Sequence, residues 1–232
     1  METKIQTWKE YLAEECSKEY FLKLKSFIAE ERKTKLIHPT PDKLFACFKQ
    51  TELSNTRVVI MGAEPYPSAN YNDGLAWSTT NYNRPASLNN IFNEVISDWA
   101  PNFVNAFNLA FKTNGLSSWA KQGVLLMNGL LTVEDLKPGS HQNKGWETFT
   151  SNTLSMLSKE KEHLVFIFWG NKAQQYKSSV DGKKHLILEA GHPDPKSKNA
   201  FRDCKHFTKC NNYLNKHFLN IKPGINWFTF NN

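Results

Sequence analysis

Three side chains capable of chemistry stand where short apolar runs of the sequence end. Glu64 comes shortly after the first run, Asn128 ends the second, and His192 follows the fourth. Ligands of open α/β sheets bind outside the carboxyl ends of the strands, so we expect a carboxylate, an amide and an imidazole to converge on one edge of a sheet. A carboxylate and an imidazole can exchange protons, and an amide can both donate and accept hydrogen bonds, so the set could bind and act on a polar ligand.

Each of these side chains also has a purely structural explanation. Glu64 beside prolines could solvate a turn, Asn128 could cap the next segment, and His192 could be an ordinary loop histidine. Their joint placement at three strand ends favours a site. The loop 191–195 reads Gly-His-Pro-Asp-Pro, and its two prolines fix φ, which suits a rigid binding loop.

The elements that must position these residues alternate between strands and helices. Continuously apolar runs predict strands buried on both faces at 58–61, 124–127, 164–169 and 186–188. Helical patterns predict one or two helices over about 7–31, a short one from Pro41 that leads directly into the first strand, and others at 88–95, 146–157, 173–176 and 203–217. Thr7 and Glu10 have the spacing of a capping box at the start of the first predicted helix. The alternation predicts a parallel sheet covered on both faces.

Length and composition limit the possible classes of protein. The 232 residues, 40% of them hydrophobic, suffice for one large domain with its own core. The net charge of +7 suits a polyanionic partner such as nucleic acid without identifying one. No apolar run approaches the ~18 residues of a membrane span, and nothing at the N-terminus resembles a signal peptide, so we expect a soluble, cytoplasmic protein without a membrane partner.

The cysteines leave two interpretations open near the end of the chain. None of the four lies in a CxxC pair, so reduced thiols are expected. Cys204, His206 and Cys210 could offer three metal ligands. At helical spacing, however, positions 204, 207, 210 and 214 form an apolar stripe that includes Phe207 and Leu214. The stripe is favoured, and no metal or cofactor is predicted.

Short motifs spread over most of the chain match one known family. They are Met61–Pro67 (MGAEPYP), Asp73–Ser78 (DGLAWS), Pro85–Ile91 (PASLNNI), Trp119–Asn128 (WAKQGVLLMN), Gly191–Ser197 (GHPDPKS), Cys204–Lys209 and Ile225–Trp227. These resemble, in order, the GQDPYH and HGLAFS segments, the proline-rich loop, the WAxQGVLLLN run, the AHPSPLS loop, the closing helix and the terminal IDW of the common uracil-DNA glycosylase family. The resemblance implies a single domain over 1–232, with a central four-stranded, mostly parallel, twisted sheet flanked by helices on both faces.

The resemblance also implies an activity. Members of the family flip uracil out of single- or double-stranded DNA and hydrolyse its N-glycosidic bond, which starts base-excision repair, and they act as monomers without a cofactor. By the family pattern Asn128 would bond the O4 and N3 edge of uracil, Tyr66 would block the methyl group of thymine, and Trp77 would stack on the ring beside Ala63. A protein inhibitor or a replication partner remains an open question.

The same pattern implies roles in bond cleavage and in DNA binding. His192 would donate a hydrogen bond to uracil O2 as negative charge develops there, and Glu64 would stabilise the cation-like sugar and position or deprotonate the attacking water. The residues expected to contact DNA are Pro85, Ser87, Gly170, Asn171, Asp194, Lys196 and Ser197.

Several positions of the expected site depart from the family pattern, among them Trp77, where the family has phenylalanine. Glu64 replaces an aspartate, and its additional methylene carries the carboxylate about 1 Å further out, a displacement that can cost ~10²-fold in rate. Pro67 replaces a histidine, and Asn171 replaces a serine. In the loop that corresponds to the family's DNA-wedging loop, Lys196 replaces an apolar leucine and Asp194 replaces a phosphate-contacting serine. Lys196 and Lys198 could offset the negative charge of Asp194.

Three functions therefore compete. The first is an active uracil-DNA glycosylase, the second a protein of the same fold that has lost the chemistry and binds DNA or a partner, and the third an unrelated nucleotide-binding α/β protein. The sequence has no GxGxxG or GxxxxGK[ST] loop, which disfavours the third. Tyr66, Asn128 and His192 favour the first, because a pure DNA-binding module has no need of all three.

Overall fold

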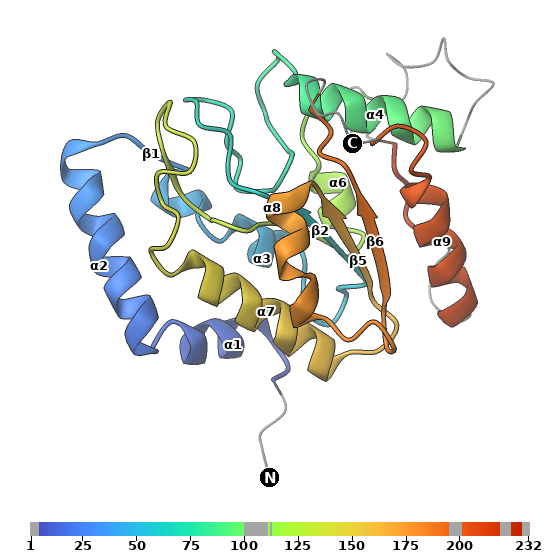
Figure 1. Cartoon of the computed structure of the whole chain (residues 1–232), viewed down its shortest axis with the longest axis horizontal. Coiled ribbons are helices and arrows are strands. Elements are labelled where there is room, and N and C mark those ends of the chain that lie inside the picture. The colour runs from blue at the N-terminus through green and yellow to red at the C-terminus, as the bar shows by residue number, and fades with distance from the viewer. Residues whose placement is uncertain (1–4, 100–110, 112, 195–200, 219–223, 229–232) are drawn as a thin grey trace.

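A four-stranded parallel sheet forms the centre of the molecule. The computed structural model describes residues 5–99, 111, 113–194, 201–218 and 224–228 (Figure 1). The strands lie in the order β3-β2-β5-β6, and every neighbouring pair is parallel. Their bounds are Val58–Gly62 for β2, Val124–Asn128 for β3, Val165–Trp169 for β5 and Leu186–Ala190 for β6. The predicted α/β class is confirmed.

The register of the sheet aligns the carboxyl ends of its strands. Gly62 pairs with Asn128 across β2 and β3, and Trp169 pairs with Ala190 across β5 and β6. The segments after all four strands therefore leave the same edge of the sheet, as the sequence predicts.

One expectation about strand burial is wrong. Every residue of β2, β3 and β5 is buried, because these strands have neighbours or helices on all sides. The fourth strand, β6, lies at the edge of the sheet, and of its five residues only Leu188 is buried, while Glu189 is exposed. The strand at the other edge, β3, is buried because α3 and α6 pack against it. A run of three apolar residues does not report how completely its strand is covered.

Helices cover both faces of the sheet. In Figure 1, α7 (Trp146–Glu160) and α8 (Asn171–Gln174) lie on one side, and α4 (Ala86–Trp99) and α9 (His206–His217) lie on the other. The N-terminal segment forms two helices, α1 (Trp8–Glu15) and α2 (Glu19–Thr34), and Thr7 and Glu10 form the expected capping box. The remaining elements are β1 (Ile37–His38), η1 (Pro41–Lys43), α3 (Ala46–Gln50), α6 (Ser117–Ala120), β4 (Val133–Glu134), which pairs with β1, and η3 (Gln175–Ser179).

Two helix boundaries differ from expectation. The segment from Pro41 forms a 3-10 turn before α3, and turns separate α3 from β2, so it does not lead directly into the strand. The last helix begins at 206 rather than 203. Asp203 and Lys205 have φ of 60° and 53°, and the Glu94 carboxylate accepts their backbone N–H groups at 2.8 and 3.1 Å. Left-handed residues cannot continue an α-helix.

The cysteine stripe packs as a helix face. Phe207, Cys210 and Leu214 are all buried on α9, which confirms the apolar interpretation for three of its four positions; Cys204 precedes the helix and is partly buried. Nδ1 of His206 accepts a hydrogen bond from the Trp169 indole at 3.1 Å. Within the residues described, no three His, Cys, Asp or Glu side chains are grouped to hold a metal ion. In the same part of the chain, no helix is long and apolar enough to cross a membrane.

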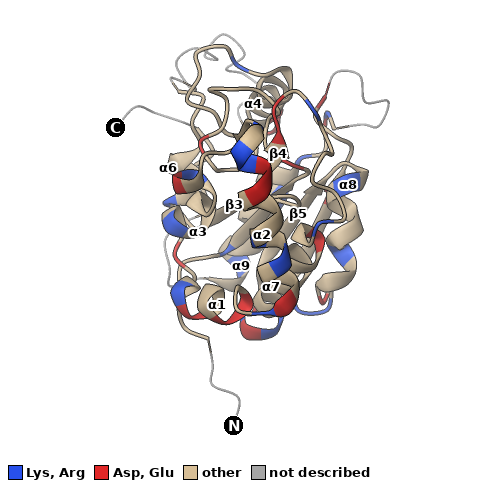
Figure 2. Cartoon of the chain, turned by 90° about the vertical axis from the view of Figure 1, so that its left-hand side faces the viewer, with Lys and Arg blue, Asp and Glu red and all other residues tan. Residues whose placement is uncertain are grey.

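Basic and acidic residues are interspersed on the side of the molecule that carries α1 and α2 (Figure 2). On α2, Lys23 pairs with Glu19 and Lys33 with Glu30, both at 2.6 Å. These charges of α2 are therefore paired with opposite charges one turn away on the same helix.

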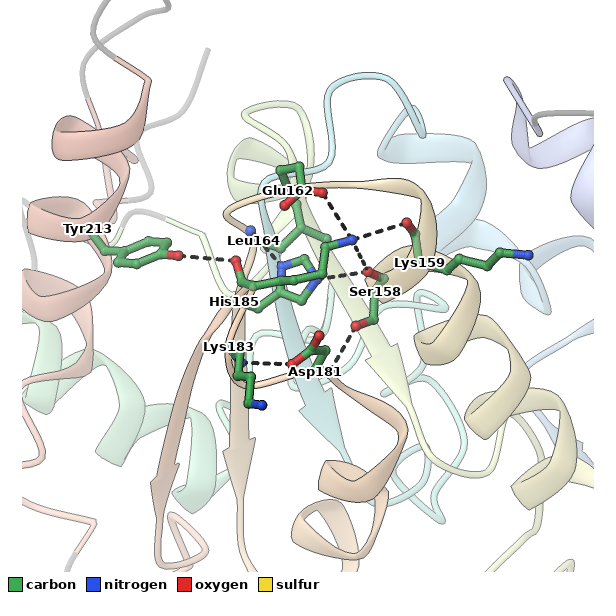
Figure 3. A network of polar contacts seen from close by, with 9 residues as sticks. Ser158, Lys159, Glu162, Leu164, Asp181, Lys183, His185 and Tyr213 are labelled. Atoms are coloured by element: carbon green, nitrogen blue, oxygen red, sulfur yellow. Dashed lines mark hydrogen bonds and ion pairs between the residues drawn. The ribbon is translucent and has the colours of Figure 1, made fainter.

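A buried histidine joins the amino ends of the strands, at the edge of the sheet opposite the strand ends described above (Figure 3). His185 accepts the Leu164 backbone N–H through Nδ1 at 3.1 Å, and its Nε2 donates to the Ser158 carbonyl at 3.0 Å. Lys184 adds hydrogen bonds to the carbonyls of Ser158 and Lys159. These contacts tie the end of α7 to β5 and β6.

Candidate active site

A cleft of about 530 Å³ opens at the carboxyl edge of the sheet. It collects residues at or just after the ends of all four strands, together with Leu75 and Trp77 from the segment before α4, Ser87 of α4 and Pro138. Of the residues predicted from the sequence, the cleft is lined by Ala63, Glu64, Tyr66, Trp77, Ser87, Asn128, Gly170, Asn171, His192 and Asp194. Pro85 is not among the lining residues, and Lys196 and Ser197 lie outside the described residues.

The amide of Asn128 is packed against the end of β2. A Cβ on Gly62 would stand 2.2 Å from Asn128 Oδ1, so only glycine leaves space for this side chain. Backbone hydrogen bonds from Gly129 to Gly62 and from Leu130 to Ala63, both 2.9 Å, continue the pairing beyond the strands. Asn128 is only 9% exposed, and its amide makes no hydrogen bond with another described residue. A buried amide without a protein partner is suited to a ligand.

Tyr66 forms a fixed wall of the cleft. Its hydroxyl donates to the Trp77 carbonyl at 3.1 Å and lies 3.3 Å from Ser87 Oγ, while Asn72 Nδ2 donates to the Tyr66 carbonyl at 2.7 Å. Burial raises the pKa of this phenol well above its ordinary value, so it stays neutral. Tyr66 therefore presents an uncharged ring of fixed position to the cleft.

Trp77 presents its indole to the same cleft and is 8% exposed. Its Nε1 donates to the Met61 carbonyl at 3.3 Å, and the centroid of its ring lies 5.1 Å from that of His192. A phenylalanine, which the family has here, could not make this hydrogen bond. The indole thus has a fixed orientation beside the imidazole.

The protonation of His192 is determined by one backbone contact. Its Nδ1 accepts the Asp194 N–H at 3.0 Å, so the neutral imidazole must carry its proton on Nε2. Burial lowers the pKa of His192. The negative charge of Asp194 raises this pKa, and the positive charge of Lys172 lowers it. At neutral pH the residue is therefore an uncharged donor.

Two neighbours hold the His192 loop in place. Asn90 on α4 donates from Nδ2 to the Pro193 carbonyl at 2.7 Å. Gly170, with φ of 84°, lets the loop approach closely, because a Cβ there would stand 2.9 Å from His192 Cβ. No sequence signal distinguishes Asn90 from other polar residues of its helix.

Glu64 enters the cleft with both carboxylate oxygens contacted. Oε2 accepts the Gly139 backbone N–H at 2.7 Å, and Oε1 lies 3.8 Å from Lys172 Nζ. Pro138 and Lys172 also line the cleft. Sequence reasoning missed Pro138, Gly139 and Lys172. Lys172 directly follows Asn171, which is among the predicted residues, whereas the Pro138-Gly139 pair indicates only a turn and not its approach to Glu64.

The fold and the cleft place the chain among the α/β proteins that bind a ligand at the carboxyl edge of a parallel sheet. Comparison with known proteins specifies the family. The model of the uracil DNA glycosylase superfamily matches residues 48–215. The chain belongs to this superfamily, as its motifs predict.

Relatives and solved structures agree with this assignment. The uracil-DNA glycosylase of Amoebophilus asiaticus is 45% identical over 224 residues, which are 95% of this chain and 97% of the relative. That of Campylobacter lari is 42% identical over 225 residues, 96% and 93% of the two chains. The crystal structure of mimivirus uracil-DNA glycosylase matches with a TM-score of 0.81 at 29% identity, covering 94% of this chain and 85% of that one. A variant of mimivirus UNG in complex with UGI matches with a TM-score of 0.80 at 30% identity, covering 94% and 86%.

Proposed function

We propose that the protein excises uracil from DNA by flipping the nucleotide into the cleft and hydrolysing its N-glycosidic bond, the first step of base-excision repair. The observation that carries the proposal is the meeting in one cleft of an amide without a hydrogen-bond partner among the described residues, a neutral imidazole and a carboxylate. Water is the only other reactant that this hydrolysis requires.

Asn128 accounts for the choice of base. Its NH₂ group can donate to uracil O4 while its carbonyl accepts the N3–H. Cytosine has an amino group at position 4 and no proton on N3, so both hydrogen bonds would be lost and buried polar groups left unpaired. Tyr66 occupies the space that a thymine methyl needs, and Trp77 stacks on the flipped ring.

His192 and Glu64 serve the two charges that develop during cleavage. As the N-glycosidic bond breaks, its electron pair moves onto uracil and the sugar becomes cation-like. Nε2–H of His192 donates to uracil O2 and stabilises the departing anion. Glu64 faces the opposite charge on the sugar and orients the water, whose oxygen bonds to C1′ while its proton passes to the carboxylate.

The rim of the cleft provides the contact with DNA. We assign this role to residues beside the cleft and in the His192 loop: Pro85, Ser87, Gly170, Asn171, Asp194, Lys196 and Ser197. The net charge of +7 supports attraction to phosphates, and binding should weaken as salt rises because counterions are released.

The test is release of free base from three oligonucleotides that differ only in carrying uracil, cytosine or thymine at one position. We expect the wild type to release uracil only, and Asn128→Asp to lose at least ~10²-fold on uracil while gaining measurable release of cytosine. Binding of all three oligonucleotides without release of any base would instead support a DNA-binding protein without chemistry.

A further inference from the structure

Glu64 is contacted from two sides by groups from distant parts of the chain. The Gly139 backbone N–H, 2.7 Å from Oε2, belongs to the loop after β4. Lys172 Nζ, 3.8 Å from Oε1, belongs to α8, which lies directly after β5 in the chain. The place of the carboxylate is thus set by contacts outside the segment that carries it.

Such contacts matter more for glutamate than for aspartate. Glutamate has one more methylene and one more rotatable bond, so its carboxylate reaches further and can occupy more positions. A displacement of about 1 Å at a reacting group can cost ~10²-fold in rate. Because the Glu64 side chain is only 11% exposed, solvent screens a neighbouring charge weakly there.

Lys172 has no competing ion pair in the part of the chain that the structure describes. Its side chain lines the cleft and is 58% exposed, and Glu64 is the one acidic group within ion-pair distance among those residues. Burial is the largest cause of the lowered pKa of His192, and Asp194 raises this pKa. The charge of Lys172 lowers it further. Lys172 is therefore within electrostatic reach of both groups assigned to the chemistry.

We propose that Lys172 is a positioning residue that, together with the Gly139 N–H, sets the place of the Glu64 carboxylate and so compensates for the extra length of glutamate. The proposal rests on the uracil excision proposed above. Lys172 acts through Glu64 and not on the substrate, so its loss should affect the rate at saturation more than the apparent affinity.

The kinetic test compares Lys172→Met, which keeps an apolar stem without the charge, with Lys172→Arg, which keeps the charge. On saturating uracil oligonucleotide we expect Lys172→Met to lower kcat about three- to tenfold, to change KM less than about twofold, and Lys172→Arg to recover most of the rate. A KM that rises while kcat stays at the wild-type value would overturn the proposal, because a lysine that only contacts phosphate gives that result.

Lys177→Met is the matched control. Lys177 lies in the same stretch of chain, is 51% exposed, and pairs with Glu189 at 2.5 Å without lining the cleft. This variant should keep the wild-type kcat and KM. A loss of kcat equal to that of Lys172→Met would show a general effect of removing surface charge and would overturn the proposal.

A second readout does not need turnover. The amide ¹H–¹⁵N resonance of Gly139 reports its hydrogen bond to Glu64 directly. We expect it to shift in Lys172→Met and to stay unchanged in Lys177→Met. An unchanged Gly139 resonance in Lys172→Met would overturn the positioning role. The proposed uracil excision is tested separately, by whether the wild type releases uracil in the kinetic assay.

Discussion

Nδ1 of His192 accepts a hydrogen bond from the backbone N–H of Asp194 at 3.0 Å. An N–H can donate only to a nitrogen with a free lone pair, so this contact is incompatible with a proton on Nδ1. Burial acts in the same direction by lowering the pKa of His192. The backbone of the loop thus selects the neutral form with its proton on Nε2, which can stabilise an anionic leaving group without carrying a charge of its own.

Removal of this donor should slow excision in a way that depends on the leaving group. We expect His192→Ala to lower the single-turnover rate on a uracil oligonucleotide by about 10²- to 10³-fold. The 5-fluorouracil anion is more stable and needs the donor less, so the loss on a 5-fluorouracil oligonucleotide should be clearly smaller. Equal losses on the two substrates would contradict the role of His192 at the leaving group.

Gly62 should be essential for the place of Asn128. A methyl group on Gly62 would meet Asn128 Oδ1 at 2.2 Å and displace the amide, so Gly62→Ala should lower the rate on the order of 10²-fold. Gly182→Ala is the control, because a Cβ there meets Ile187 Cδ1 at an ordinary 3.4 Å. Single-turnover assays of the two variants check this, and a Gly62→Ala enzyme as fast as Gly182→Ala would contradict the packing argument.

Acid should destabilise the fold through buried histidines. His206 is 2% exposed, and burial lowers its pKa to about 4, whereas an unfolded histidine binds a proton near pH 6.5. Between these values unfolding takes up a proton, so the free energy of unfolding should fall as pH drops from about 6.5 to about 4, by about 3 kcal/mol from this residue. His141 and His185, whose pKa values burial also lowers, act in the same direction.

Urea unfolding at a series of pH values measures this effect. His206→Asn keeps an acceptor for the Trp169 indole, which lies 3.1 Å from His206 Nδ1, but does not titrate. Its free energy of unfolding should therefore fall less steeply below pH 6.5 than that of the wild type. Identical pH profiles for the two proteins would show that His206 titrates normally in the fold.

Much of the site could be predicted because its residues lie at strand ends. Continuous apolar runs identify β2, β3 and β5, and a parallel register brings the segments after these strands to one edge of the sheet. The sequence alone therefore predicts that Glu64, Asn128 and His192 lie together, and all three line the cleft. The family assignment rests on motifs at these strand ends and on others elsewhere, such as 85–91 and 225–227. The functional roles of these residues remain predictions.

Other contacts depend on approaches between segments that no periodicity reports. Gly139 reaches Glu64 across 75 positions of sequence, and Asn90 reaches Pro193 across 103. The exposure of β6 depends on how completely other elements cover it, since β3 at the other edge of the sheet is buried, and a run of three apolar residues does not specify this. Lys196, which replaces the family's wedge residue, lies outside the described residues, so its role is still only an expectation.

The most direct test of the account is release of free uracil from a single-stranded uracil oligonucleotide by the wild type and by Glu64→Ala, with DNA binding of both measured by fluorescence anisotropy over a range of salt. The account predicts that the wild type releases uracil, that Glu64→Ala releases essentially none, and that both bind DNA with the same salt dependence. A Glu64→Ala protein that releases uracil at the wild-type rate, or a wild type that binds the oligonucleotide and releases nothing, would contradict it.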